Sequence, residues 1–136
     1  MKLDHIGIAV HDIQEALQVY QAALGLQLQE IVEVPDQKVE VAFLPVGETN
    51  LELVQPTADD TGIARFLESR GEGIHHICLE VDDIEAALER LKAHGVLLID
   101  KAPRQGAHGR VAFVHPKGMH GVLLELVEHH TRTASG

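Results

Sequence analysis

The chain opens on hydrophobic residues that recur at every second position, a pattern that predicts a β-strand. In this first segment Ile6 and Ile8 fall on one face, while His5 and Gly7 fall on the other. Asp12 then stands where a helix N-cap is expected, and hydrophobic residues follow it at helical spacing. The elements predicted for this first part are a strand over 3–10, a helix over 13–24, and strands over 26–34, 39–44 and 51–54.

The second part of the chain repeats the first. The segment DHIGIAVHDIQEALQVY, which begins at Asp4, matches HHICLEVDDIEAALERL, which begins at His75. The elements predicted here are a strand over 74–81, a helix over 84–94, and strands over 96–99, 110–114 and 122–127, with a loop over 103–109. Two repeats of this size predict one α+β domain over 1–136, with module one at 1–58, a linking helix at 59–73, module two at 74–128 and a frayed tail at 129–136.

Each repeat carries one histidine and one glutamate at matching positions. His5 corresponds to His76, and Glu52 corresponds to Glu125. The strand alternation places all four side chains on the face opposite the helices. A carboxylate within an apolar strand needs a partner, because an unpaired buried charge costs several kcal/mol. Two imidazoles and two carboxylates suit a divalent metal ion; the alternative is two His–Glu pairs that duplication alone preserved.

The repeat is broken at Glu40, whose counterpart is Arg110. We predict that Glu40 lies on the ligand face beside Ala42, where a departure from symmetry makes it a candidate for chemistry. The alternative is a solvated glutamate on an edge strand. Among the histidines outside the repeat, His108 lies in a loop that is expected to border the cavity.

Composition narrows the function further. The net charge is −10 and aromatic residues make up 3% of the chain, which argues against nucleic-acid binding. Cys78 is the single cysteine, which excludes an intrachain disulfide and cysteine-based metal sites. No apolar run approaches the ~18 residues of a membrane span, so we expect a cytoplasmic protein without membrane contacts. The cations expected near the cavity mouth are Lys101, Arg104, Arg110 and Lys117.

These residues resemble the vicinal oxygen chelate superfamily, and within it the methylmalonyl-CoA epimerase family. The resemblance runs from about Leu3 to Glu128. It implies two βαβββ modules that form a curved mixed sheet around a divalent metal, with Co²⁺ expected before Mn²⁺, Ni²⁺ or Zn²⁺. The motifs that carry it are Leu3-Asp4-His5-Ile6, Gly73-Ile74-His75-His76-Ile77, Gly106-Ala107-His108-Gly109, Val114-His115-Pro116-Lys117 and Gly121-Val122-Leu123-Leu124-Glu125-Leu126.

The resemblance also implies roles for single residues. It identifies His5, Glu52, His76 and Glu125 as metal ligands, and Glu40 with Glu125 as the two bases that epimerise a CoA thioester through a metal-chelated enolate. Lys101, Arg104, His108 and Lys117 are expected to contact the substrate, and a homodimer is expected because family members are commonly dimers.

Three alternatives stay open on the sequence. Glyoxalase I shares the fold and a His/Glu/His/Glu set. An extradiol dioxygenase has a site with two histidines and one carboxylate, and a second ligating glutamate argues against it. A metal-free binding protein of the same fold has no need of all four ligands.

Overall fold

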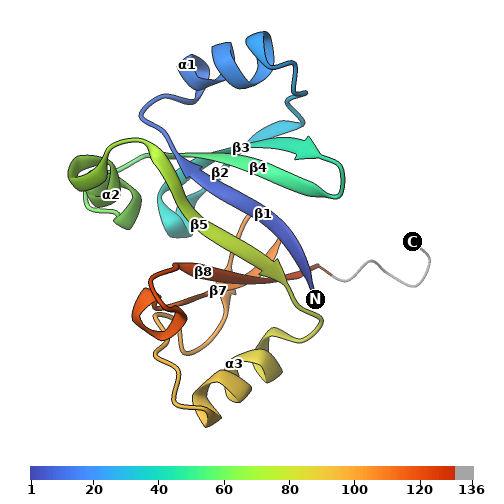
Figure 1. The fold of residues 1–136 in the computed structure, drawn as a ribbon, viewed down its shortest axis with the longest axis vertical. Helices are drawn as coiled ribbons and strands as arrows, with labels where there is room; N and C mark the ends of the chain where they lie inside the picture. Colours follow the sequence, from blue (N-terminus) through green and yellow to red (C-terminus); the bar gives the residue numbers. More distant parts are fainter. Residues whose placement is uncertain (131–136) are drawn as a thin grey trace.

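The computed structural model describes residues 1–130, which form one curved, eight-stranded mixed sheet with helices on both sides (Figure 1). The order of strands across the sheet is β2-β3-β4-β1-β5-β8-β7-β6. The strands are β1 (Lys2–Ala9), β2 (Glu30–Val34), β3 (Val39–Val46), β4 (Thr49–Pro56), β5 (Gly73–Glu80), β6 (Arg104–Gln105), β7 (Gly109–Val114) and β8 (Leu124–His129).

The two repeats meet at the centre of the sheet. β1 pairs with β5 in antiparallel fashion, and each of them pairs on its other side with the last strand of its own module, β4 or β8, in parallel fashion. The four strands that carry the predicted ligands are therefore neighbours. The predicted α+β fold with two βαβββ modules in a curved mixed sheet is confirmed.

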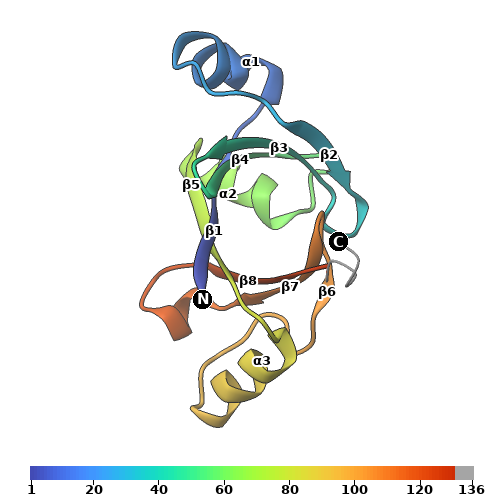
Figure 2. The ribbon, with the colours of Figure 1, turned by 90° about the vertical axis from the view of Figure 1, so that its right-hand side faces the viewer.

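One helix of each module packs on the outer, convex side of the sheet (Figure 2). These helices are α1 (Ile13–Leu17), which continues as the π-helical η1 (Gln18–Ala23), and α3 (Ile84–Ala93). Asp12 and Asp83 cap them, each accepting a hydrogen bond from a backbone N–H in the first turn. A second contact at the start of each helix is also repeated in the two modules. Gln55 accepts a hydrogen bond from the Ile13 N–H, and Glu128 accepts one from the Ile84 N–H.

The linking helix α2 (Gly62–Arg70) lies on the concave side of the sheet (Figure 2). It falls within the segment predicted to link the modules. Ile63 and Leu67 pack against Val39, Val41 and Phe43 of β3 in one hydrophobic cluster. α2 thereby closes one end of the concave surface with apolar side chains.

The predicted strand over 96–99 is wrong. Leu98 makes only an isolated bridge to Val114, and the edge strand β6 lies at Arg104–Gln105, inside the predicted loop. Val96 and Leu98 instead pack against the buried face of α3, next to Leu88. Their hydrophobic side chains are thus partly buried although neither residue belongs to a strand. β2 is also shorter than predicted, since pairing begins at Glu30.

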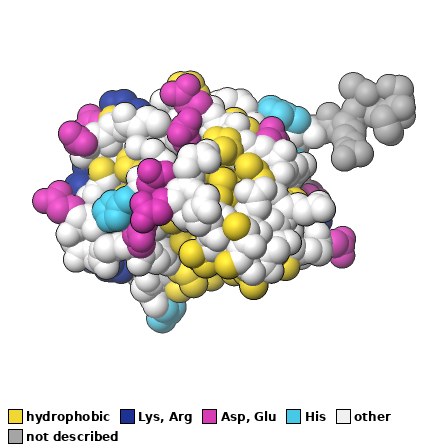
Figure 3. All heavy atoms as spheres, turned by 90° about the horizontal axis from the view of Figure 1, so that it is seen from above, with side chains coloured by type: hydrophobic (Ala, Val, Ile, Leu, Met, Phe, Trp, Pro, Cys, Tyr) yellow, Lys and Arg dark blue, Asp and Glu magenta, His cyan; other side chains and the backbone are white. Residues whose placement is uncertain are grey.

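The outer surface is acidic at the α1 end of the molecule, where acidic side chains border a group of exposed hydrophobic ones (Figure 3). Val19 and Leu24 of this helical segment are 61% and 64% exposed. Within residues 1–130, every helix falls short of the length and apolarity that crossing a membrane requires.

Candidate active site

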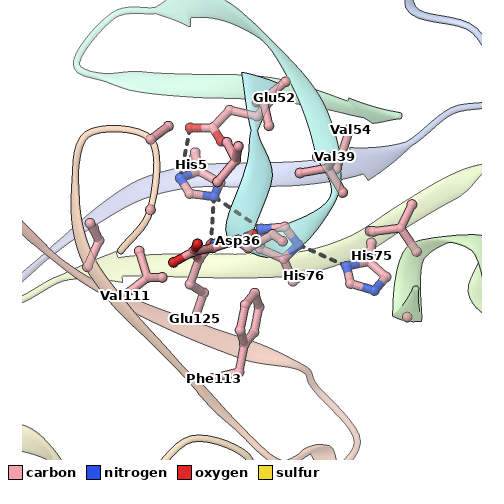
Figure 4. A pocket seen from close by; sticks show the side chains of 18 of the residues that line it. His5, Asp36, Val39, Glu52, Val54, His75, His76, Val111, Phe113 and Glu125 are labelled. Atoms are coloured by element: carbon pink, nitrogen blue, oxygen red, sulfur yellow. Dashed lines mark hydrogen bonds and ion pairs between the residues drawn. The ribbon is translucent and has the colours of Figure 1, made fainter. Parts of the chain in front are cut away.

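The concave side of the sheet holds a cavity of about 500 Å³ that all four predicted ligands line (Figure 4). His5 comes from β1, Glu52 from β4, His76 from β5 and Glu125 from β8. All four side chains are buried, with residue exposures of 5–7%. The surrounding wall is largely apolar. Such a cavity with a few convergent polar groups is the usual form of a small-molecule site.

Three of the four side chains converge on one point. His5 Nε2 lies 3.1 Å from His76 Nε2, and Glu125 Oε1 lies 3.1 Å from each of these nitrogens. Two ligand atoms at right angles to each other and about 2.1 Å from one ion lie about 3.0 Å apart. The triangle of atoms therefore has the size of one face of a metal coordination sphere, and the residues fit a divalent ion.

Glu52 lies on the other side of the His5 ring. Its Oε2 is 2.9 Å from His5 Nδ1, while Glu125 Oε1 is 3.1 Å from His5 Nε2. Two buried carboxylates thus flank one imidazole (Figure 4). The structure brings Glu52 to the site predicted for it, one ring away from the point on which the other three converge.

Burial and the contacts among these side chains shift the pKa values of His5, Glu52 and Glu125. Burial would lower the pKa of His5, but its contacts with Asp4, Cys78 and the two glutamates raise it well above its ordinary value. Burial would likewise raise the pKa of Glu125, but hydrogen bonds from His5 and His76 hold it well below its ordinary value. Burial raises the pKa of Glu52, and the contact with His5 opposes this only in part. These contacts therefore favour the ionised form of Glu125 at the centre of the site.

The prediction that Glu40 lies on the ligand face is wrong. Among the described residues, the cavity is lined from β3 by Val39, Val41 and Phe43, and Glu40 is not part of its wall. Glu40 pairs with Gln55 on β4, whose side chain reaches the N-terminus of α1. Since directly paired residues share a face, Glu40 lies on the convex, helix-covered side.

Regular strand alternation would turn His75 away from the face that carries His76, yet His75 also lines the cavity. The pairing of β1 with β5 skips His75, because Gly7 pairs with His76 and Ile8 pairs with Ile74. This β-bulge breaks the alternation and turns His75 to the same side as His76. Burial and the neighbouring His76 lower the pKa of His75 to about 4.

The predicted substrate contacts divide into two groups. Arg104 and His108 line the cavity, whereas Lys101 and Lys117 lie outside its wall in the described part of the chain. The sequence missed two other cations that line it, which are Lys38 after η2 (Pro35–Gln37) and Arg65 on α2. Both belong to segments whose position over the concave face follows from the three-dimensional fold.

His129 and His130, which were assigned to the predicted tail, make defined contacts. His129 is the last residue of β8, and its Nε2 lies 2.6 Å from Asp4 Oδ1. His130 donates its backbone N–H to the His108 carbonyl. Residues 131–136 of the predicted tail lie outside the described residues.

Comparison with known proteins agrees with this geometry. Residues 4–113 match the model of the glyoxalase/bleomycin resistance protein/dioxygenase superfamily. The chain is 43% identical to the mitochondrial methylmalonyl-CoA epimerase of Dictyostelium discoideum, over 93% of this chain and 78% of that one. It is 42% identical to the ethylmalonyl-CoA/methylmalonyl-CoA epimerase of Cereibacter sphaeroides, over 92% of this chain and 96% of that one.

Solved structures show the same relationship. Methylmalonyl-CoA epimerase from Mycobacterium tuberculosis superimposes with a TM-score of 0.92 at 37% identity, over 99% of this chain and 92% of that one. A methylmalonyl-CoA epimerase in complex with methylmalonyl-CoA and NH4+ superimposes with a TM-score of 0.91 at 35% identity, over 96% of this chain and 95% of that one. The resemblance noted in the sequence is confirmed, and the chain belongs to the methylmalonyl-CoA epimerase family of isomerases, within the glyoxalase/bleomycin resistance protein/dioxygenase superfamily.

Proposed function

We propose that the protein epimerises methylmalonyl-CoA at the carbon between its thioester carbonyl and its carboxylate. The observation that carries the proposal is the buried triangle of His5 Nε2, His76 Nε2 and Glu125 Oε1, whose edges are 3.1 Å long. The 42% identity to an ethylmalonyl-CoA/methylmalonyl-CoA epimerase over nearly both whole chains supports it.

The proposal includes one divalent ion, Co²⁺ before Mn²⁺, Ni²⁺ or Zn²⁺, which His5, His76 and Glu125 would hold at the point where their three atoms converge. Glu52, whose Oε2 contacts His5 Nδ1, would join them by turning its side chain toward that point. When bound, the ion would supply Lewis-acid stabilisation of the enolate oxygen. The donor set of two imidazoles and two carboxylates suits these ions, and Glu125 brings the negative charge that a cation needs in a buried site. Val54, Val111 and Phe113 line the cavity beside the donors, and these apolar side chains lower the local polarity and so strengthen the charge interactions of the donors.

Inversion requires that a proton leave one face of a planar enolate and return to the other. We propose Glu125 as one of the two acid–base groups. Glu40 lies on the convex side of the sheet, so the second group must come from the cavity wall. Glu52 is the other buried carboxylate among the described residues. Since Glu52 and Glu125 flank His5 from opposite sides, we propose Glu52 for the opposite face.

The CoA moiety carries phosphates, which need cations at the cavity. Arg104 lies over Phe113, 5.7 Å from the ring centroid, and its Nε forms an ion pair with Asp100 Oδ1 at 3.4 Å. Lys38 and Arg65 line the same cavity, and both contact Asp60, which lies just before α2. We propose that these three cations bind the CoA thioester, in place of Lys101 and Lys117.

A glyoxalase I activity is the second candidate, because the chain is also 30% identical to the lactoylglutathione lyase of Salmonella typhimurium, over 94% of this chain and 93% of that one. Turnover of methylmalonyl-CoA, measured beside turnover of the methylglyoxal–glutathione hemithioacetal, decides between the two. We expect epimerisation of the thioester and little isomerisation of the hemithioacetal; the reverse result would assign the site to the lyase reaction.

Two further properties belong to the proposal. We propose a homodimer, for which light scattering during size-exclusion chromatography should give twice the chain mass of 14.9 kDa. A cytoplasmic location is also proposed, and cell fractionation tests it.

A further inference from the structure

The residues that precede the two cavity histidines occupy matched β-bulges. Along the pairing of β1 with β5, Leu3 pairs with Leu79 and His5 with Cys78, so Asp4 is an extra residue on β1. Further along the same pairing, His75 is an extra residue on β5. Asp4 and His75 are counterparts in the sequence repeat. The two modules thus carry the same irregularity at the same position.

Each bulge places a hydrogen-bonding partner on the outer nitrogen of the histidine that follows it. Neighbouring residues of a regular strand point to opposite faces, and a bulge removes that restriction. Asp4 Oδ2 accordingly lies 2.7 Å from His5 Nδ1, and His75 Nδ1 lies 2.9 Å from His76 Nδ1. In both pairs the contact is made at Nδ1, and in both histidines Nε2 is the atom that faces Glu125. His5 Nδ1 also contacts Glu52 Oε2, at 2.9 Å, so Asp4 shares this nitrogen with a second carboxylate.

The two partners are themselves held in place. Asp4 uses its second oxygen, Oδ1, to accept a hydrogen bond from His129 Nε2 at 2.6 Å. The ring of His75 packs edge-on against Phe66 of α2, with 5.0 Å between the ring centroids. The end of β8 and the face of α2 therefore limit how far either partner can move away from its histidine.

We propose that Asp4 and His75 are positioning residues, which fix the two histidine rings so that both Nε2 atoms face one point. The inference rests on the metal site of the proposed function, and it adds the residues that orient that site. A ring whose Nδ1 is engaged in this way presents Nε2 as the free nitrogen, and loss of such an outer partner typically lowers metal affinity about 10- to 100-fold.

The first test measures Zn²⁺ affinity by competition with a chelator. We expect Asp4→Leu and His75→Leu each to lower the affinity about 10- to 100-fold. Asp4→Asn and His75→Asn keep an acceptor oxygen at about the same place, so they should recover part of the loss. His11→Leu, at an exposed histidine outside the cavity, is the control and should bind Zn²⁺ like the unmodified protein.

The second test does not depend on metal. Nitrogen-edited NMR of the histidine rings in the metal-free protein should show a ring proton, protected from exchange, between His75 and His76. We expect His75→Leu to lose this signal and His75→Asn to retain it, with thermal unfolding confirming that both variants fold. If the unmodified protein binds no Zn²⁺, the metal site of the proposed function fails, and the NMR result alone decides the positioning role. Unchanged Zn²⁺ affinity in both leucine variants, or an unprotected ring proton in the unmodified protein, would overturn the inference.

Discussion

Gly7 lies directly opposite His76 in the antiparallel pairing of β1 with β5, and a side-chain carbon on Gly7 would overlap the imidazole ring of His76. The ring cannot retreat easily, because His75 holds its Nδ1 and Glu125 contacts its Nε2. The site therefore requires glycine at position 7, because the His76 ring occupies the space that a side chain there would fill.

We expect Gly7→Ala to displace the His76 ring and to lower both Zn²⁺ affinity and epimerisation by at least tenfold, since a misplacement of about 1 Å can cost 10²-fold in rate. Chelator competition and a coupled epimerase assay measure the two losses. Gly73→Ala is the matched control on β5, because nothing lies within 4 Å of an added carbon there. Equal activity of the two variants would show that the ring has more freedom than its contacts indicate.

The carboxylates of β3 and β4 should differ sharply in function. Glu40→Gln should keep turnover within about twofold, because Glu40 lies on the convex side. Glu52→Gln should lose about 10²–10⁴-fold in epimerisation, the usual cost of a missing general base. In deuterated water it should still exchange the proton of one epimer without inverting it, since Glu125 continues to serve one face. NMR of the recovered thioester measures this, and fast inversion by Glu52→Gln would remove Glu52 from the mechanism.

The cations of the cavity should control substrate binding. Lys38→Ala, Arg65→Ala and Arg104→Ala should each raise KM for the CoA thioester more than they lower kcat, because they remove contacts far from the reacting carbon. The effect should shrink with rising salt, which screens exposed charges. Lys117→Ala, outside the cavity wall, is the control. A larger rise of KM in the control than in the three variants would place the phosphates outside this cavity.

Stability should depend on pH through Glu128. The Ile84 N–H and Arg110 lower the pKa of this carboxylate. A pKa that is lowered in the folded state stabilises the fold above the ordinary pKa of Glu near 4.3, and this contribution is lost as pH falls through the lowered value. Glu128→Gln, which copies the Gln55 contact of the other module, should cost about 0.3–1 kcal/mol at pH 7. Urea unfolding of the metal-free proteins at pH 7 and pH 3 should show the difference shrinking at the lower pH; a constant difference would contradict the charge-based account.

The sequence repeat was enough to predict the fold, both outer helices and the cavity positions of His5, Glu52, His76 and Glu125. These positions follow from regular alternation on strands whose hydrophobic faces are clear. Glu40 was misplaced because residues 39–44 are apolar on both faces, except for Glu40 itself, so the pattern does not say which face is the cavity.

The hydrophobic pattern did not predict the bulges at Asp4 and His75. That pattern assumes that each residue of a strand pairs with one residue of its neighbour. A bulge adds one unpaired residue to one strand, and it is defined only against the partner strand, which is distant in sequence. Likewise, Val96 and Leu98 have the hydrophobicity of a strand, but they are partly buried by packing against α3 and belong to no strand. Lys38 and Arg65 carry no local signal at all, because only the fold brings their segments to the cavity.

The central claim is that the epimerisation proceeds at a metal held by the two histidines and the glutamates. Its most direct test is the rate at which the metal-free protein, titrated with Co²⁺, incorporates deuterium at the epimerised carbon of methylmalonyl-CoA. We predict no incorporation above background without metal, and a rise that saturates at one ion per chain. Full incorporation by protein shown to be free of metal, or none after one ion is bound, would contradict the account.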